Sequence, residues 1–418
     1  MIRSSRIIVP VTAAGLLLTA CGGDGAREWQ GTVTDSAGVE VVSNTGSGLW
    51  ASDEGWTVQQ DLVIGTAEGD PDYQFGQIAG LDVGDDGRVY VTDQQAQQIR
   101  VFSSEGEFLT TLGQPGSGPG ELSPAVGQVF VTPGDTVVVP DLGLQRLSRY
   151  SPTGETLEST PLPMTEGLPV KWMEAPDNSL VQQSMVMQLP GQQEVEQKNL
   201  LLRRSPDGEV LDTVMEMPMG GTVSFAGGQP SFKIFESEPM WTIGPDGRLY
   251  FGVNSQYRIE VYSPGGELTR VVQKPGERTA ITDSDETEYR RVIEDAWQRQ
   301  GMNAQAMELM SQALSFAEFY PAYANILGGP EGSLWVQAIQ TPDAVAEAGG
   351  TFNLQDIGAP TWEVFDDQGR LLGTVTMPPR FTPILFVNDH IYGVLRDELD
   401  VQYVARMTVD RGGAPVAG

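Results

Sequence analysis

The side chains that most often carry out catalysis are scarce in this sequence. The chain of 418 residues contains one histidine, His390, and one cysteine, Cys21. A zinc site needs several Cys or His ligands, and a Ser-His-Asp triad needs a histidine beside its serine. His390 follows a short turn between two predicted strands, where a side chain usually faces solvent, so we predict neither kind of chemistry. The sequence favours a binding protein over an enzyme.

Carboxylates are the abundant reactive groups. The chain has 56 Asp and Glu against 25 Lys and Arg, which gives a net charge of −31. Paired carboxylates can act as a general acid and base, and a ring of them can bind calcium through oxygen ligands. The same charge excludes nucleic acid as a partner, and it excludes binding to an anionic membrane surface through basic residues, because both need clustered Lys and Arg.

One acid and one base lie on either side of a predicted loop. Asp141 ends a predicted strand and Arg146 begins the next one, while Asp93 and Asn254 occupy similar places elsewhere. The spacing predicts an Asp141–Arg146 ion pair that braces the loop, and both residues are candidate ligand contacts. The alternative is that this ring of Asp and Asn side chains holds a calcium ion.

The N-terminus has the pattern of a secretion signal. Two arginines precede an apolar stretch over residues 7–18, which is too short to span a bilayer, and the sequence LTAC follows, ending at Cys21. This ending resembles a bacterial lipobox, in which the cysteine thiol receives a diacylglycerol. Two acyl chains are enough for stable anchoring.

The predicted organisation follows from that ending. We predict a lipoprotein signal peptide over residues 1–20, lipidation at Cys21, and a lipid-anchored tether with an N-terminal segment over 21–48. Deleting 22–48 should then cost little stability. The glycine after Cys21 implies, by the same resemblance, delivery to the outer membrane, so the expected location is the bacterial cell envelope, with the lipid as the only membrane contact.

The rest of the chain is a repeat. A turn rich in Pro, Asp, Asn and Gly recurs six times, each time before a short run of β-branched and aromatic residues, and a second turn follows five of them. One unit is therefore strand, short turn, strand, variable loop, strand, short turn, strand. Four antiparallel strands repeated at a spacing above about 40 residues are typical of a β-propeller blade. The first turns begin at Asp85, Pro133, Pro176, Pro245, Pro330 and Val387.

The sixth unit lacks its fourth strand. Residues 56–64 run into Gly65 as the fourth strand of the first unit runs into Gly113, so the N-terminal segment can complete the last blade. Such closure removes an exposed sheet edge. We predict an all-β fold, a six-bladed β-propeller over residues 49–418 closed by an N-terminal strand. A pair of β-sandwiches is the alternative.

One segment breaks the β pattern. Apolar residues at helical spacing predict a small helical hairpin over about 282–318, inserted between blades four and five. We expect it to form a lid over the channel mouth and to contribute Trp297, Tyr320 and Tyr323 to ligand contact. The alternative is that its apolar stripes pack on each other and on the propeller rim.

The loop lengths are unequal on the two faces of the predicted propeller. All turns between first and second strands and between third and fourth strands are short, whereas the long segments lie between second and third strands or between blades. Both long classes emerge on the same face. Elaborated loops on a rigid scaffold are where binding is usually found.

The repeat motifs can be compared with a known family. A DG turn, then VYV-x-D, then RI-x-VF with a later GE resembles the NHL-type six-bladed β-propellers, in particular bacterial lipoproteins of that class. The resemblance implies the fold far more than an activity. We expect a non-catalytic scaffold that binds a peptide, a glycan or another envelope protein and needs no cofactor. The alternative is a calcium-dependent hydrolase or lyase with a site at the channel mouth.

Overall fold

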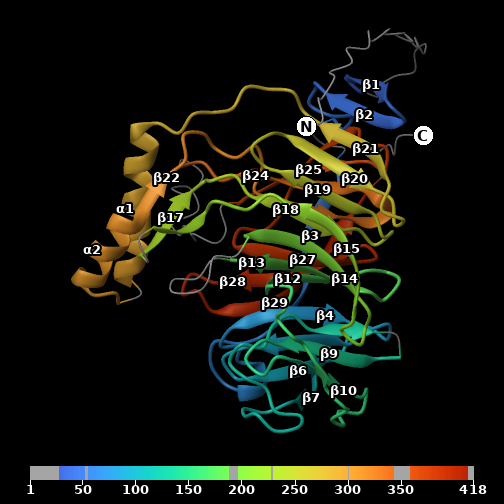
Figure 1. Cartoon of the computed structure of the whole chain (residues 1–418), viewed down its shortest axis with the longest axis vertical. Helices are drawn as coiled ribbons and strands as arrows, with labels where there is room; N and C mark the ends of the chain where they lie inside the picture. Colours follow the sequence, from blue (N-terminus) through green and yellow to red (C-terminus); the bar gives the residue numbers. More distant parts are fainter. Residues whose placement is uncertain are drawn as a thin grey trace, which may run out of the picture.

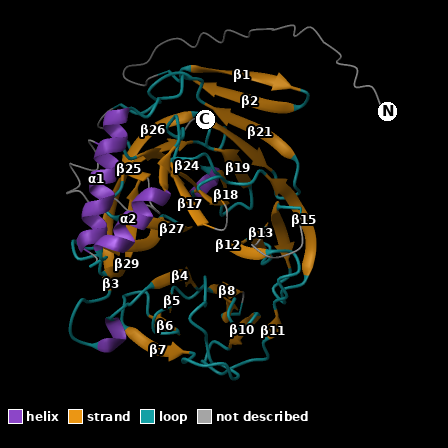
Figure 2. Cartoon of the chain, turned by 60° about the vertical axis from the view of Figure 1, so that its left-hand side comes forward, coloured by secondary structure: helices purple, strands orange, loops and turns teal. Residues whose placement is uncertain are grey.

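The computed structural model describes residues 28–51, 55–132, 134–187, 196–226, 229–299, 301–342 and 358–412. Six four-stranded antiparallel blades are arranged around a common centre, as Figures 1 and 2 show. The predicted six-bladed β-propeller is confirmed. Blades one to three comprise β4 (Ile78–Val83), β5 (Val89–Asp93), β6 (Gln98–Phe102) and β7 (Phe108–Leu112); β8 (Phe130–Thr132), β9 (Thr136–Asp141), β10 (Arg146–Tyr150) and β11 (Thr160–Pro161); β12 (Leu168–Glu174), β13 (Leu180–Val186), β14 (Lys198–Arg204) and β15 (Val210–Met217).

Blades four to six continue the same order of strands. They comprise β18 (Pro239–Ile243), β19 (Leu249–Val253), β20 (Arg258–Tyr262) and β21 (Leu268–Gln273); β23 (Asn325–Gly328), β24 (Leu334–Ile339), β25 (Gly358–Phe365) and β26 (Leu371–Thr376); β27 (Phe381–Val387), β28 (His390–Arg396), β29 (Gln402–Asp410) and β3 (Thr57–Ile64).

The ring closes through the N-terminal strand, as predicted. β3 pairs antiparallel with β29, with Val58 opposite Val409 and Ile64 opposite Val404. Trp56, just before β3, packs with Trp50 and Trp335 in the core between blades five and six. The first and last parts of the propeller are thus held together by one sheet.

The short turns follow from local backbone chemistry. Gly87, between β4 and β5, has φ +81°, and Gly106, between β6 and β7, has φ +86°. Glycine adopts these left-handed conformations without the steric cost that a Cβ brings. Such turns join first to second and third to fourth strands and define one face of the propeller, here called the turn face. The opposite face, which carries the remaining connections, is called the loop face.

The N-terminal segment forms a hairpin that packs on the propeller. β1 (Gly31–Ser36) and β2 (Val39–Asn44) form a hairpin, and β2 pairs parallel with β21, which extends blade four to six strands. The hairpin turn uses Ala37 at φ 57° and Gly38 at φ 86°, the positive values that a type I′ turn requires. Within the predicted tether and N-terminal segment over 21–48, the residues from 31 onward thus pack on blade four.

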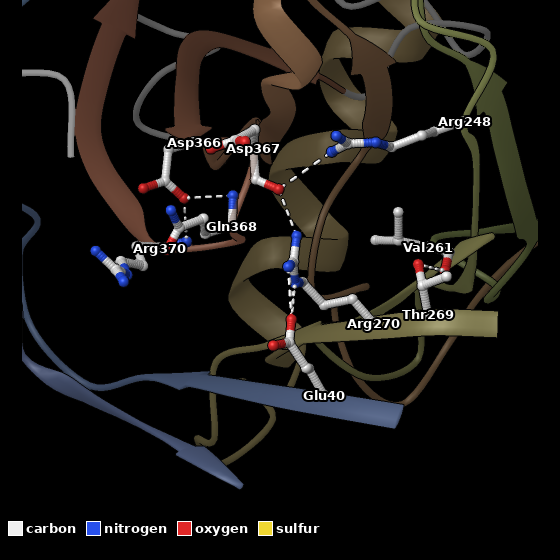
Figure 3. A network of polar contacts seen from close by, with 9 residues as sticks. All are labelled: Glu40, Arg248, Val261, Thr269, Arg270, Asp366, Asp367, Gln368 and Arg370. Atoms are coloured by element: carbon white, nitrogen blue, oxygen red, sulfur yellow. Dashed lines mark hydrogen bonds and ion pairs between the residues drawn. The ribbon is translucent and has the colours of Figure 1, made fainter. Parts of the chain in front are cut away.

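Side chains fasten this hairpin to two blades. Arg270 of β21 pairs with Glu40 of β2 at 2.5 Å and also donates to the carbonyl of Asp367, in the turn between β25 and β26 (Figure 3). Arg248 donates to the same carbonyl at 3.1 Å. Buried Asn44 accepts from the backbone N–H of Leu371 at 2.8 Å.

The two longest connections between blades pack into a separate unit on the loop face, here called the loop-face module. It consists of α1 (Asp283–Arg299), α2 (Ala304–Ala313) and a three-stranded sheet of β16 (Val223–Ala226), β17 (Gln229–Ile234) and β22 (Leu314–Phe316). Figure 1 places both helices beside β17 and β22. The predicted helical hairpin between blades four and five is confirmed, except that residues 314–316 form a strand.

That exception has a physical cause. Leu314 pairs in parallel register with Phe232 of β17, and its backbone has an extended conformation at the C-cap of α2. The partner strand comes from the connection between blades three and four, far away in sequence, so a helical stripe could not reveal it. Among the described helices, none is long and apolar enough to cross a membrane.

Candidate functional site

A cavity of about 700 Å³ occupies the centre of the ring. Its walls come from the first strands of all six blades: β4, β8, β12, β18, β23 and β27. It extends from residues of the loop face, such as Gly127 and Leu142, to residues in turns of the turn face, such as Pro176 and Pro245. This size is typical of pockets that bind small molecules.

Most residues that line the cavity are apolar, but polar atoms make up nearly half of its surface, and a few of the side chains are ionisable. The described inner strands contribute Asp82, Lys171 and Glu174, and the turn after β4 adds Asp85. Glu174 ends β12 and Asp85 follows β4, so these acids lie at the turn-face end, contributed by blades one and three. Convergent polar groups in an apolar cavity are the usual mark of a ligand site.

Asp82 joins blade one to blade two. Its carboxylate accepts from the backbone N–H of Val131, on β8, at 2.7 Å and from that of Val83 at 2.8 Å. Burial raises the pKa of Asp82 to about 7, and the two N–H donors oppose that rise. The carboxyl group therefore exchanges its proton near neutral pH.

Glu174 faces those acids from blade three. Burial raises the pKa of Glu174 to about 8, and the nearby carboxylates of Asp82 and Asp85 add to the rise. A protonated carboxyl can donate a hydrogen bond, whereas an ionised one only accepts. Near neutral pH the turn-face end of the cavity can thus both donate to and accept from a ligand.

Lys171 lies on β12 and contacts blade four. Its Nζ donates to the backbone carbonyl of Trp241 at 2.5 Å and lies 4.6 Å from the centroid of the Trp241 ring. Burial lowers the pKa of Lys171 to about 8. The cavity therefore holds an amine and two carboxyl groups that all change charge close to neutral pH, a grouping that is enriched at functional sites.

A Glu174→Gln variant is expected to unfold at a higher temperature than the wild type at pH 8, and at nearly the same temperature at pH 4. The folded protein keeps the Glu174 proton up to about pH 8, whereas the unfolded chain releases it near 4.5. The bound Glu174 proton therefore makes its full contribution to the free energy of unfolding below pH 4.5, and this contribution is lost as the pH rises through 8. Glutamine avoids the loss, which we put at about 1–2 kcal/mol because water enters the cavity.

Thermal unfolding followed by circular dichroism at pH 4 and pH 8 measures this difference. Glu209→Gln, an exposed change in a turn of blade three, is the matched control and should alter neither temperature. If Glu174→Gln and wild type unfold together at pH 8, the raised pKa is refuted.

The predicted Asp141–Arg146 ion pair is wrong. The Asp141 carboxylate accepts from the backbone N–H of Ser123 at 2.8 Å, from the Ser123 hydroxyl, and from the N–H of Leu144 at 3.0 Å. Arg146 instead donates to the carbonyls of Gly118 and Glu121, both at 2.7 Å. Both residues brace loops of blades one and two, and neither lines the central cavity.

The alternative of a calcium ring finds no free ligands at these positions. Asp93 pairs with Arg100 at 2.9 Å, and Asn254 is bonded to the N–H of Glu238 and to the carbonyl of Tyr323. In the part of the chain that the structure describes, no group of three or more His, Cys, Asp or Glu side chains could hold a metal ion.

The three predicted aromatic contacts are buried. Trp297 is 6% and Tyr320 9% exposed, and both belong to the core of the loop-face module. Tyr323 is fully buried between blades four and five, against Tyr257. The structure thus places all three side chains where the alternative put them, in packing contacts, and brings none of them to the cavity wall.

His390 lies where the sequence predicted, at the start of β28 on the turn face. Its side chain is 37% exposed, and its Nε2 is 3.9 Å from the Asp61 carboxylate. Cys21 falls outside the described residues. The sequence analysis missed the cavity residues Lys171 and Glu174, although a charged residue inside a first strand, as also at Asp82 of β4, is a usable signal.

Comparisons with known proteins agree with the fold. A family model described as 6-bladed beta-propeller matches residues 68–250. No curated protein matches the chain. Among solved structures, an exported protein of Bacteroides fragilis is 12% identical over 84% of this chain and 95% of its own, with a TM-score of 0.48.

Two further structures are similar at the same level. Virginiamycin B lyase from Staphylococcus aureus is 13% identical over 84% of this chain and 99% of its own, with a TM-score of 0.43. A Bacteroides vulgatus protein is 10% identical over 86% and 99%, with a TM-score of 0.45. Likeness at this level says nothing about activity. The chain is a six-bladed β-propeller by its sheet topology and by the matching family model.

Proposed function

We propose that the protein is a lipid-anchored propeller of the bacterial envelope, of the NHL-like type, that binds a peptide, a glycan or another envelope protein at its loop face without turning it over. The observation that supports this most is the asymmetry of the two faces. The turn face carries short turns, whereas the loop face carries a module with its own core.

The construction of the module supports a recognition role. Its core joins Ile234 and Phe235, from one connection, to Tyr289 and Trp297 of α1, from another. Helix α2 has no buried residue among those described, and its Leu309 is 60% exposed. The Leu309 side chain on this helix is therefore open to contact with a partner.

Removal of the module in two coordinated cuts is expected to leave a folded propeller that no longer binds its partner. The joining points lie close together in the fold: the N–H of Tyr320 lies 2.9 Å from the carbonyl of Thr279, and the N–H of Thr222 lies 2.6 Å from the carboxylate of Glu238, just beyond the second cut. Residues 280–319 and 223–235 are each replaced by a short Gly/Ser linker. Peptide arrays, glycan arrays and pull-downs from envelope extracts compare this variant with the wild type.

The matched control removes only residues 280–319. It leaves Ile234 and Phe235 without their partners, so we expect it to aggregate. If the doubly cut variant keeps full binding, the loop-face proposal fails.

The envelope location depends on Cys21. Cys21→Ser is expected to give an unlipidated protein that leaves the membrane fraction, because the lipid is the proposed anchor. Fractionation and labelling with a radioactive fatty acid measure this. A serine variant that still sediments with membranes and incorporates the label contradicts the proposal.

A second candidate function, a hydrolase or lyase, is favoured by one observation. The carboxyls of Asp82 and Glu174 have pKa values of about 7 and 8, which suits a general acid and base. The calcium that the sequence alternative invoked is tested directly: if calcium raises the unfolding temperature and a chelator reverses the rise, a calcium site exists. If the wild type shows a hydrolase or lyase activity and both Asp82→Asn and Glu174→Gln lose it, the protein is an enzyme that uses these two carboxyl groups.

A further inference from the structure

Lys171 differs from the other lysines of the chain. The sequence contains four, and Lys198, Lys233 and Lys274 each pair with a glutamate within 2.9 Å. No carboxylate among the described residues lies within ion-pair distance of Lys171, whose Nζ contacts only the carbonyl and ring of Trp241. Among the described residues, Lys171 is thus the one lysine that lines the central cavity and has no carboxylate partner.

The surroundings of Lys171 favour a neutral amine. Strand β13 beside it and β18 across from it contribute no charged side chain. The charged groups of the same cavity are Asp82, Asp85 and Glu174. A carbonyl and an aromatic face favour the ammonium form, whereas burial favours the neutral amine and lowers the pKa of Lys171 to about 8.

We propose that Lys171 binds a small aldehyde with an apolar body as an imine inside the central cavity. The cavity of about 700 Å³ has room for such a ligand, and its lining includes the apolar side chains of Trp172, Met173 and Phe386. A desolvated lysine amine in an apolar pocket is the nucleophile that attacks carbonyl carbons. The inference does not depend on the function of the loop face.

The reaction needs no further reactant. The amine nitrogen bonds to the carbonyl carbon, the carbonyl oxygen takes up two protons, and it leaves as water while a C=N bond forms. In total, one ammonium and one aldehyde give one iminium and one water, with no oxidation or reduction. Water hydrolyses the iminium in the reverse direction, so binding is reversible.

We expect an aldehyde to react with Lys171 much faster than with the other three lysines. At pH 7.5 a lysine with a pKa of about 8 is roughly one quarter neutral, against about 0.1% for a lysine at the ordinary value of ~10.4. Even with slower access to the cavity, we expect Lys171 to react at least about tenfold faster than Lys198, Lys233 or Lys274. The rate should level off above about pH 8.

The test uses the purified full-length protein with benzaldehyde and cyanoborohydride, which reduces the imine to a stable amine. Peptide mass spectrometry then follows each lysine separately, and the α-amino group, with an ordinary pKa near 8, is the positive control. In urea the four lysines should react at similar rates. Folded wild-type protein that modifies Lys171 no faster than Lys233 overturns the proposal.

Two variants separate a reactive lysine from a merely structural one. Lys171→Arg keeps the charge and a donor for the Trp241 carbonyl but cannot form the imine, so it should stay folded and lose the fast labelling. Lys233→Arg is the matched control and should leave the Lys171 rate unchanged. If Lys171→Arg fails to fold, the labelling rates of the individual lysines in the wild-type protein still test the proposal.

Discussion

A chain that lacks residues 22–65 is expected to aggregate instead of folding into a soluble propeller. The deletion removes β3, so the nine-residue strand β29 loses its partner along the outer edge of blade six. It also removes Trp56 from the core that it shares with Trp335, and Ile64, which is 1% exposed. A long unpaired edge strand recruits other chains.

The matched truncation, which lacks only residues 22–48, is expected to stay soluble but to be less stable. It loses the β1–β2 hairpin, including Val42 and the hydrogen bonds of Asn44 with Gly369 and Leu371. We put this loss at about 3 kcal/mol, from one buried valine and a few hydrogen bonds. The sequence alone predicted almost no cost, because it treated this segment as a tether.

Light scattering and thermal unfolding distinguish the two truncations. A synthetic peptide of residues 55–66 should restore solubility to the longer truncation by adding the missing strand in trans. Closure by β3 would be disproved if both truncations were equally soluble and unfolded at the same temperature.

The blade count and the closure could be predicted because they depend on local chemistry. Turns such as the one at Gly87 fix where strands reverse, and alternation fixes which residues face inward. The missing fourth strand of the last unit then had one candidate partner at the other end of the chain. Each step used a window of a few residues, and the structure agrees with it.

The features that the sequence analysis did not predict all depend on contacts between segments that are far apart in the chain. The pairing of β2 with β21 is parallel and joins residues about 230 positions apart, so no turn signals it. An apolar stripe looks the same in a lid as in a core, which is why Trp297 and Tyr320 were expected to contact a ligand. Only the fold shows that Phe235, from another connection, packs against Tyr320 and that Trp297 belongs to the same core.

The cavity residues were hidden for a related reason. Lys171 and Glu174 stand on one short strand. Burial shifts both pKa values, and the acids Asp82 and Asp85 of blade one add to the shift of Glu174. The sequence identifies the strand but does not say which of its residues face the central cavity. A charged residue in a first strand of a propeller is therefore a better guide to the site than the strand-end Asp residues that the sequence analysis chose.

Those strand-end acids allow a sharp comparison, because two of them occupy equivalent places and differ in one contact. Asp93 and Asp141 both accept backbone N–H groups of neighbouring loops. Asp93 in addition pairs with Arg100 at 2.9 Å, with side chains 1% and 9% exposed, whereas Asp141 has the Ser123 hydroxyl in that role.

Asp93→Asn is therefore expected to destabilise the protein by about 3–5 kcal/mol, because it leaves a buried Arg100 cation without its carboxylate. The same isosteric change at Asp141 leaves no buried cation without its carboxylate, and we expect it to lower the free energy of unfolding by about 1–2 kcal/mol. Urea denaturation measures both. Adding Arg100→Met to Asp93→Asn should recover part of the loss, since the stranded charge is removed. Equal losses for the two single variants would show that the ion pair contributes nothing beyond the loop hydrogen bonds that both aspartates make.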